Sequence, residues 1–138
     1  IKNTHIEGGE WPQGLFHSYT GYDDVERNSS LIIKDSSIRN LHSSDLAYIG
    51  GDSLDEGEIK LERSIITGNT LDKITNAYSY NNGSATVNIS DSTISNNSIN
   101  SDGINSISAI NIERSELCEN TIEGETDASL IPAKNIAN

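Results

Sequence analysis

A nine-residue phrase recurs five times in this chain, and its recurrence restricts the possible folds more than any other feature. The starts of the copies are separated by 32, 28, 28 and 23 residues, so the phrase is constant while the connections vary in length. Variable length is typical of surface loops, whereas a constant phrase is typical of a unit that stacks on its own copies. The five copies are IKNTHIEGG from Ile1, IKDSSIRNL from Ile33, LERSIITGN from Leu61, ISDSTISNN from Ile89 and IERSELCEN from Ile112.

Two positions of the phrase are aliphatic in every copy, which predicts buried β-strands. Copies two to five carry another apolar residue two positions before the phrase, and this spacing places both side chains on one face of a strand. We therefore expect each position to form a continuous file of side chains through a narrow core. The first-position residues are Ile1, Ile33, Leu61, Ile89 and Ile112, and the sixth-position residues are Ile6, Ile38, Ile66, Ile94 and Leu117.

Hydroxyl and amide residues at two further positions predict corners between short strands. The step of five residues from the first to the sixth position breaks the strand period, so we expect a corner there, with the fourth-position hydroxyl bonded to nearby backbone. Because Asn tolerates positive φ, we expect a second corner at the ninth position, with hydrogen bonds between stacked amides. Leu41, at the ninth position of the second copy, does not fit this pattern. The hydroxyl residues are Thr4, Ser36, Ser64, Ser92 and Ser115, and the amides are Asn69, Asn97 and Asn120.

The third position changes charge from copy to copy. After Asn3 it is Asp35, Arg63, Asp91 and Arg114. Stacked about 4.8 Å apart as neighbouring strands, these residues would form a ladder of ion pairs on an outer face. Exposed pairs contribute only about 0–1 kcal/mol, and we interpret the ladder as structural.

The phrase Ile-x-x-Ser-x-Ile-x-x-Asn resembles the coils of right-handed parallel β-helix proteins of the pectate-lyase-like kind. The resemblance extends to surface adhesin and passenger domains of the polymorphic outer-membrane type, on the tetrapeptides ITGN at 66–69, ISNN at 94–97 and LCEN at 117–120. That family prefers Phe at the first position of the tetrapeptide, and only Gly50 and Gly51 remain of its Gly-Gly-Ala-Ile motif. The resemblance implies an all-β solenoid of about five to six coils. We expect residues 1–138 to be a single β-helix domain, a segment of a longer rod.

A leucine-rich repeat is the alternative fold, since INIERSEL at 110–117 fits its signature if Ser replaces Asn. The polar connections between the copies disfavour a leucine-rich repeat.

A weaker repeat lies in these connections. The segments LFHSYTG at 15–21, AYIGG at 47–51 and AYSYNNG at 77–83 predict a further strand in each turn, and the last two are 30 residues apart.

The net charge of the chain limits the classes of molecule that it can bind. Nine Lys plus Arg stand against 21 Asp plus Glu, a net charge of -12, which repels phosphate backbones and anionic lipid. We therefore expect no nucleic-acid partner, and the absence of a long apolar run predicts no membrane insertion. The single Cys118 excludes an internal disulfide.

Six aromatic residues outside the phrase are candidates for ligand binding, because exposed rings stack on sugars and contact proteins. Trp11 is the strongest, in the turn-rich stretch GGEWPQG, which predicts a position away from any strand. The six candidates are Trp11, Tyr19, Tyr22, Tyr48, Tyr78 and Tyr80.

Two acidic stretches offer oxygen ligands for calcium, but neither has the spacing of an EF-hand, and we interpret both as solvated loops. We expect no metal and no cofactor. The stretches contain Asp52, Asp55, Glu56 and Glu58, and Asp23, Asp24 and Glu26.

The combined features predict a non-enzymatic structural or adhesive rod, extracellular or at the cell surface, without a catalytic residue in this segment. Its expected partners are a host or neighbouring-cell surface glycan or protein. End-to-end self-association is also expected, because the chain starts on the phrase, 128–138 can begin another coil, and neither end carries a cap. The resemblance also implies an alternative, a fragment of a polysaccharide lyase or hydrolase with a basic catalytic residue. Its candidates, Arg39, Lys60, Arg63 and Arg114, are scattered. A sugar-binding module is the third possibility.

Overall fold

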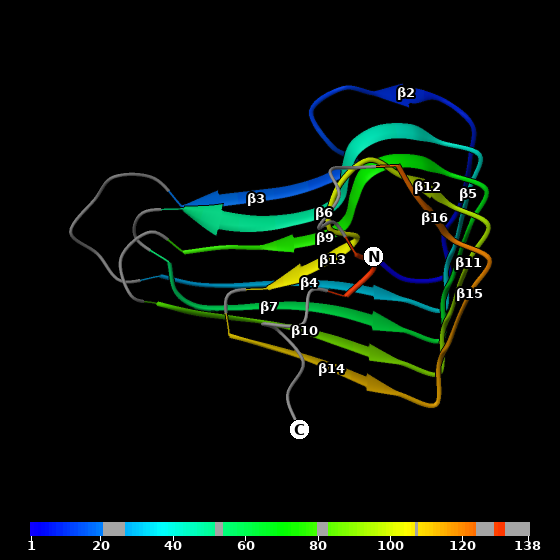
Figure 1. Ribbon diagram of the computed structural model, residues 1–138. Helices are drawn as coiled ribbons and strands as arrows, with labels where there is room; N and C mark the ends of the chain where they lie inside the picture. Colours follow the sequence, from blue (N-terminus) through cyan, green and yellow to red (C-terminus); the bar gives the residue numbers. More distant parts are fainter. Residues whose placement is uncertain (21–26, 52–53, 80–82, 107, 124–128, 132–138) are drawn as a thin grey trace.

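The chain folds into a parallel β-helix, which confirms the predicted fold class. The computed structural model describes residues 1–20, 27–51, 54–79, 83–106, 108–123 and 129–131, and these contain strands and no helix. Every strand pairing among them is parallel, and the strands form three sheets, which are the three sides of one solenoid. Figure 1 shows the first sheet along the bottom, the second at the right and the third across the top. A leucine-rich repeat is thereby excluded for the described residues, because the convex side is built from strands.

The strands of each sheet come from successive turns of the chain. The first sheet consists of β4 (Arg27–Lys34), β7 (Leu54–Glu62), β10 (Ser84–Ser90) and β14 (Ala109–Glu113). The second sheet consists of β1 (His5–Glu7), β5 (Ser37–Arg39), β8 (Ile65–Thr67), β11 (Thr93–Ser95) and β15 (Glu116–Cys118). The third sheet consists of β2 (Glu10–Trp11), β3 (Phe16–Thr20), β6 (His42–Gly51), β9 (Thr70–Ala77), β12 (Ser98–Ile99), β13 (Ile104–Ser106) and β16 (Thr121–Ile122).

The strand register follows the repeat. First-position residues pair from Ile33 to Leu61, Ile89 and Ile112 across the first sheet, and sixth-position residues pair from Ile6 to Leu117 across the second. Both files are buried in the middle of the stack, with Leu61 and Ile66 fully inaccessible to solvent. Ile1, at the open end of the stack, is 43% exposed. The core is therefore a narrow column of aliphatic side chains.

Each phrase contains two corners, and both lie one residue before the position that carries the conspicuous polar side chain. The third-position residues, from Asn3 to Arg114, all have positive φ, between 46° and 52°. The eighth-position residues Gly8, Asn40, Gly68, Asn96 and Glu119 also have positive φ. The prediction of a corner at the ninth position is therefore wrong by one residue. The prediction failed because Asn69 and Asn97 are buried and form amide hydrogen bonds, whereas the turn is made by the residues before them, Gly68 and Asn96, which have positive φ.

The solenoid has about three complete turns, fewer than the five to six expected. From β4 to β13 the chain crosses all three sheets three times. The first copy of the phrase has no strand in the first sheet, where Lys2 makes only an isolated bridge to Lys34, and the third-sheet strand of the last copy, β16, has two residues. Because the phrase occupies only one part of a turn, five copies do not require five closed turns.

The connections follow a register that differs from the expected one. Tyr48 pairs with Asn76 and Ile49 with Ala77, so β6 and β9 are offset by 28 residues and not by 30. A shift of two residues leaves the inward and outward faces of a strand unchanged, so the faces follow the sequence although the partners do not. Of the segment 128–138, only 129–131 is described, and there Ile104 donates its backbone N–H to Leu130 O at 2.7 Å.

The described residues contain no helix of the length and apolarity needed to span a bilayer.

Candidate functional site

A ladder of hydroxyl groups holds the first corner of each turn. Ser64 Oγ accepts a hydrogen bond from the backbone N–H of Ser36 in the preceding turn at 3.2 Å, and donates to the carbonyl of Glu62 at 3.0 Å. Ser92 repeats both bonds, accepting from Ser64 N at 3.1 Å and donating to Ser90 O at 2.8 Å. The hydroxyls thereby supply the acceptors for the backbone N–H groups of Ser36 and Ser64 at a buried corner, so these serines are structural.

A ladder of buried amides holds the second corner. Asn97 Oδ1 accepts hydrogen bonds from the backbone N–H and the side-chain amide of Asn69, at 3.1 and 2.9 Å. Asn97 Nδ2 donates to the Ile66 carbonyl at 3.1 Å and to Asn120 Oδ1 at 2.9 Å. Leu41, which did not fit the sequence pattern, is buried above this ladder and donates its backbone N–H to Asn69 Oδ1 at 3.0 Å. An apolar side chain is accommodated there because only the backbone N–H is needed to complete the ladder.

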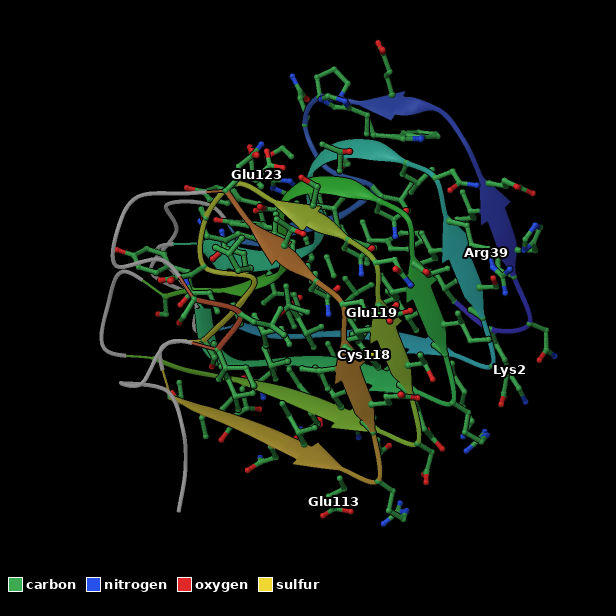
Figure 2. The ribbon with its side chains drawn as sticks, turned by 45° about the vertical axis from the view of Figure 1, so that its right-hand side comes forward. Lys2, Arg39, Glu113, Cys118, Glu119 and Glu123 are labelled. Carbon is green, nitrogen blue, oxygen red and sulfur yellow. The ribbon has the colours of Figure 1, made fainter. Side chains whose placement is uncertain are left out.

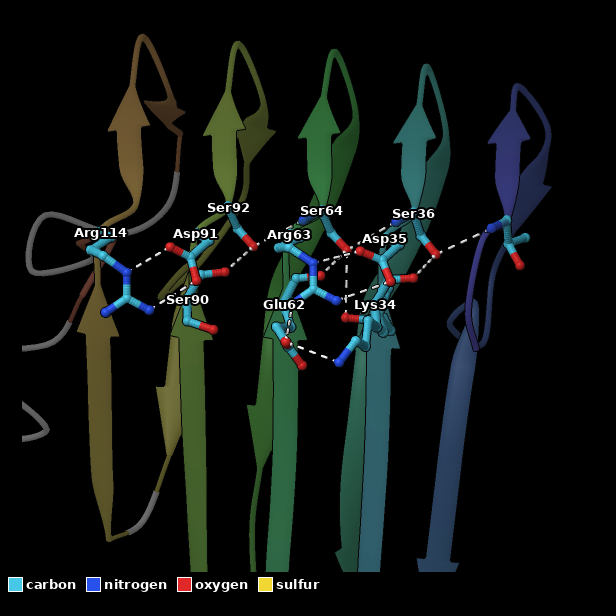
Figure 3. Close-up of polar contacts among 12 residues, drawn as sticks. Lys34, Asp35, Ser36, Glu62, Arg63, Ser64, Ser90, Asp91, Ser92 and Arg114 are labelled. Carbon is cyan, nitrogen blue, oxygen red and sulfur yellow. Dashed lines mark hydrogen bonds and ion pairs between the residues drawn. The ribbon is translucent and has the colours of Figure 1, made fainter.

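The third-position charges pair at the corners, outside the strands (Figure 3). Arg63 binds both carboxylate oxygens of Asp35, at 2.6 and 3.1 Å, and Arg114 binds both oxygens of Asp91, at 2.6 and 2.9 Å. The hydrogen bond from each guanidinium lowers the pKa of its aspartate. Lys34 likewise lowers the pKa of Glu62, from 3.0 Å. All of these groups are at the surface, so they contribute to register more than to stability.

The basic residues considered for a lyase lie on different parts of the surface. Arg63 and Arg114 are held in the corner pairs, Lys60 lies 3.1 Å from Glu58 on the first sheet, and Arg39 bonds to Ser37 on the second sheet at 2.8 Å. The structure does not bring them together around one acidic group.

The acidic stretch at Glu56 and Glu58 belongs to a strand and not to a loop. Both residues lie on β7, where they line a shallow hollow of about 470 Å³ on the first sheet. Among the described residues, no group of three His, Cys, Asp or Glu side chains could hold a metal ion. Asp23, Asp24, Glu26 and Asp52 lie outside the described residues, and the side chain of Asp55 is also outside them.

Cys118 is a free, half-buried cysteine on β15, next to the corner residue Glu119 (Figure 2). Partial burial and the neighbouring Glu116 carboxylate raise the pKa of its thiol. A raised pKa keeps the group in the less reactive thiol form.

Three of the candidate tyrosines meet on the outer face of the third sheet. Tyr19 on β3 pairs with Gly50 on β6, and Tyr78 follows β9 with its N–H bonded to Ile49 O at 2.9 Å, so the two tyrosines lie on either side of the β6 strand. Tyr19 is 50% exposed and Tyr78 36%. His17 pairs with Tyr48 two residues earlier, and their ring centroids are 4.3 Å apart with 35° between the planes.

Gly50 makes room for the ring between them. A Cβ atom added at Gly50 would lie 2.3 Å from the hydroxyl oxygen of Tyr48 and 2.7 Å from its Cζ. The Tyr48 ring therefore leans along its own strand and covers Gly50. A glycine inside a strand weakens the strand and often marks a close approach. We call the surface formed by His17, Tyr19, Tyr48, Gly50 and Tyr78 the tyrosine face.

Polar groups continue the row beside Tyr48. Asn76 on β9 donates to Asp45 Oδ2 at 3.0 Å, and Asn105 on β13 donates to Asn76 Oδ1 at 3.4 Å. Burial raises the pKa of Asp45, although the Asn76 hydrogen bond and the Lys73 charge oppose the shift. The amides and the carboxylate are thus fixed in place next to the rings.

Trp11 lies apart from this group and inside a strand, β2, where the sequence predicted a turn. It pairs with Ser43, whose neighbours in the file, Leu71 and Ile99, are fully buried. Its side chain therefore points to the interior side of the sheet, at the first turn, where it is 44% exposed. Gly9 has a φ of 111°, which favours glycine at the ninth position of the first copy, and a Cβ there would lie 2.9 Å from Trp11 Nε1. Tyr22 and Tyr80 lie outside the described residues.

Sequence reasoning missed several members and neighbours of the tyrosine face. They lie between copies of the phrase, where the expected pairing of AYIGG with AYSYNNG is two residues out of register, and they are His17, Asp45, Gly50, Asn76 and Asn105. The signal that could have found them is the alternation of small and large residues in LFHSYTG and AYIGG, aligned on the strand period.

Comparison with known proteins gives no match, since no family model, no curated protein and no solved structure matches the chain.

Proposed function

We propose that this chain is part of a secreted or cell-surface β-helical rod with a structural and adhesive role. The observation that carries the proposal is the grouping of exposed rings. Among the described residues, Tyr19 and Tyr78 are the exposed aromatic side chains on the outside of the stack, and both flank Gly50 on the third sheet. Exposed rings clustered on one face of a rod are suited to contact a partner.

The filled interior supports the same proposal. In the complete turns, aliphatic files and two polar ladders occupy the inside of the solenoid, so a partner is met by its outer surface. The resemblance to passenger domains agrees with this role, and the partners we propose are a surface glycan or protein on a host or neighbouring cell. Self-association through the end turns is part of the proposal, and concentration-dependent light scattering tests it.

Adhesion can be tested with beads that carry the whole chain. We expect the beads to bind a panel of cells, and the variant with Tyr19→Ser and Tyr78→Ser to bind them several-fold less. The matched control carries Ile32→Ser and Ile65→Ser, because these residues are 41% and 40% exposed on the first and second sheets. Equal loss in both variants, or no binding by the native chain, contradicts an adhesive role for the tyrosine face.

A polysaccharide lyase or hydrolase is the second candidate, suggested by the resemblance of the phrase to pectate-lyase-like coils. Incubation of the chain with acidic and neutral polysaccharides, with and without calcium, separates it from the rod. An unsaturated product or new reducing ends would overturn the non-enzymatic proposal.

A further inference from the structure

We infer that the tyrosine face is a subsite for a neutral glycan. This inference rests on the adhesive function proposed above and names the class of its ligand. It depends on three features, which are the spacing of the rings, the fit of Tyr48 over Gly50, and the charge of the groups around them.

The first feature is the spacing of the rings. Tyr19 on β3 and Tyr78, directly after β9, lie at either side of β6, and neighbouring strands are about 4.8 Å apart, so the two side chains start about 10 Å from each other. The ring of Tyr48 lies between them. This span suits two linked sugar rings, whose apolar faces can stack on aromatic rings.

The second feature is the absence of a side chain at Gly50. With no Cβ in the way, Tyr48 leans over the strand, and its hydroxyl is brought into the centre of the tyrosine face. The ring centroid of His17 lies 4.3 Å from that of Tyr48, and this packing restricts the motion of the Tyr48 ring. A ring fixed before binding loses little conformational entropy when a ligand stacks on it.

The third feature is the charge around the rings. Among the described residues, the hydrogen-bonding groups beside Tyr48 include the amides of Asn76 and Asn105 and the carboxylate of Asp45. Lys73 and Asp72 both act on Asp45 with opposite charges, and Asp45 is in turn bonded to Asn76. Amides and a carboxylate accept hydrogen bonds from sugar hydroxyls, whereas a carboxylate repels a uronic acid. With a chain charge of -12 in addition, a neutral glycan is favoured over an acidic one.

The test is binding of the whole chain to immobilised and soluble oligosaccharides. The neutral probes are α-1,4-linked and β-1,4-linked hexamers of glucose and a hexamer of N-acetylglucosamine. The acidic probe is hexagalacturonate. We expect at least one neutral hexamer to bind saturably in calorimetry, and Tyr19→Ala and Tyr78→Ala each to weaken it about two- to tenfold, as the loss of a stacked ring does.

Gly50→Ala is the sharpest variant, because it keeps every ring and displaces only Tyr48. The φ of Gly50 is not in the left-handed region, so alanine suits its backbone. We expect Gly50→Ala to weaken binding about as much as Tyr48→Ala, with near-native circular dichroism. Trp11→Ala and Ile65→Ala are the controls, and both should leave binding unchanged, because these residues lie on other parts of the molecule.

Three results overturn the inference. They are the absence of saturable binding by every neutral hexamer, tighter binding of hexagalacturonate, and retention of binding in the four variants Tyr19→Ala, Tyr48→Ala, Tyr78→Ala and Gly50→Ala. Beads that still adhere to cells through Tyr19 and Tyr78 without binding any glycan would identify a protein partner, which contradicts this inference and leaves the adhesive function standing. Glycan binding without cell adhesion would contradict the adhesive function and leave this inference standing.

Discussion

Asn97 Nδ2 lies 2.9 Å from Asn120 Oδ1 and 3.1 Å from the carbonyl oxygen of Ile66, so one amide joins the turn before it to the turn after it. The residue is 1% exposed. Because water cannot replace these bonds, the amide ladder couples the stability of successive turns.

Replacement of Asn97 by Ala should therefore be costly. It removes the acceptor used by both nitrogen donors of Asn69 and leaves buried polar groups unpaired, so we expect the free energy of unfolding to fall by about 3 kcal/mol in urea denaturation. Asn111→Ala is the control, because Asn111 is exposed and makes one surface bond to Asn88. A similar loss in both variants would contradict a special role for the ladder.

Asn97→Asp tests the same ladder through pH. The carboxylate keeps the acceptor but places a second oxygen against the Ile66 carbonyl and Asn120 Oδ1. We expect the folded state to raise the pKa of the new carboxyl above its unfolded value of about 3.9, because only the protonated form can donate. The variant should then become more stable relative to the native chain as pH falls from 7 towards about 4. A constant difference in unfolding free energy over this range contradicts the prediction.

The left-handed corners predict an unusual ranking of substitutions at Arg63. Its φ is 46°, which a β-branched side chain tolerates poorly and glycine tolerates freely. Both Arg63→Val and Arg63→Gly remove the contact with Asp35, so their difference isolates the backbone. We expect the valine variant to be less stable by about 2 kcal/mol. At Arg39, inside strand β5, the order should reverse, and equal ranking at the two positions would be inconsistent with the corner geometry.

Thr75 offers a stabilising substitution. It is fully buried, and among the described residues its Oγ1 is a buried side-chain oxygen without a hydrogen-bond partner. Thr75→Val keeps the shape and removes the unpaired hydroxyl, so we expect the free energy of unfolding to rise by about 1 kcal/mol. Thr67→Val, which removes a hydroxyl bonded to Ser95 at 3.3 Å, should give no gain. A loss of stability in Thr75→Val would indicate a hydrogen bond to water at this site.

Acid should weaken the corners. The pKa values of Asp35, Glu62 and Asp91 are lowered in the folded chain by Arg63, Lys34 and Arg114. Their contribution to stability is complete above the unfolded values of about 4 and is lost as pH falls through the lower folded values. Burial raises the pKa of Asp45, so the contribution of Asp45 to stability increases as pH falls. Urea denaturation at pH 7 and at about 2.5 measures the net loss, which should be smaller in the double variant Asp35→Asn, Asp91→Asn.

The phrase itself could be predicted from the sequence because each of its positions has one physical role. Leu61 and Ser64 are constant in type since a buried file and a bonded corner accept little else. The corner at Gly68 was placed at Asn69 because asparagine suits both a left-handed turn and an amide ladder, and composition alone does not separate the two uses. The run of Gly and Asn at the eighth position was the signal that distinguished them.

The tyrosine face was harder to predict because it joins three connections of different length. Tyr19, Tyr48 and Tyr78 were selected as aromatic residues, but their grouping depends on the pairing of β3 with β6 and β6 with β9. That pairing is set by how each connection closes its turn, which the constant phrase does not encode. Trp11 was ranked first on its turn-rich surroundings, yet its strand pairing with Ser43 turns its side chain inward.

The direction of the ladder bonds gives the solenoid a polarity. Ser36, Ser64 and Ser92 each donate a backbone N–H to the hydroxyl of the serine in the next turn. Asn69 and Asn97 likewise donate their backbone N–H to Oδ1 of the asparagine in the next turn. A ribosome delivers the chain in that same order, so every newly synthesised layer supplies the acceptors that the layer before it lacks. Vectorial synthesis and the hydrogen-bond pattern thus run the same way, and a nascent chain can assemble this structure one layer at a time from its amino end.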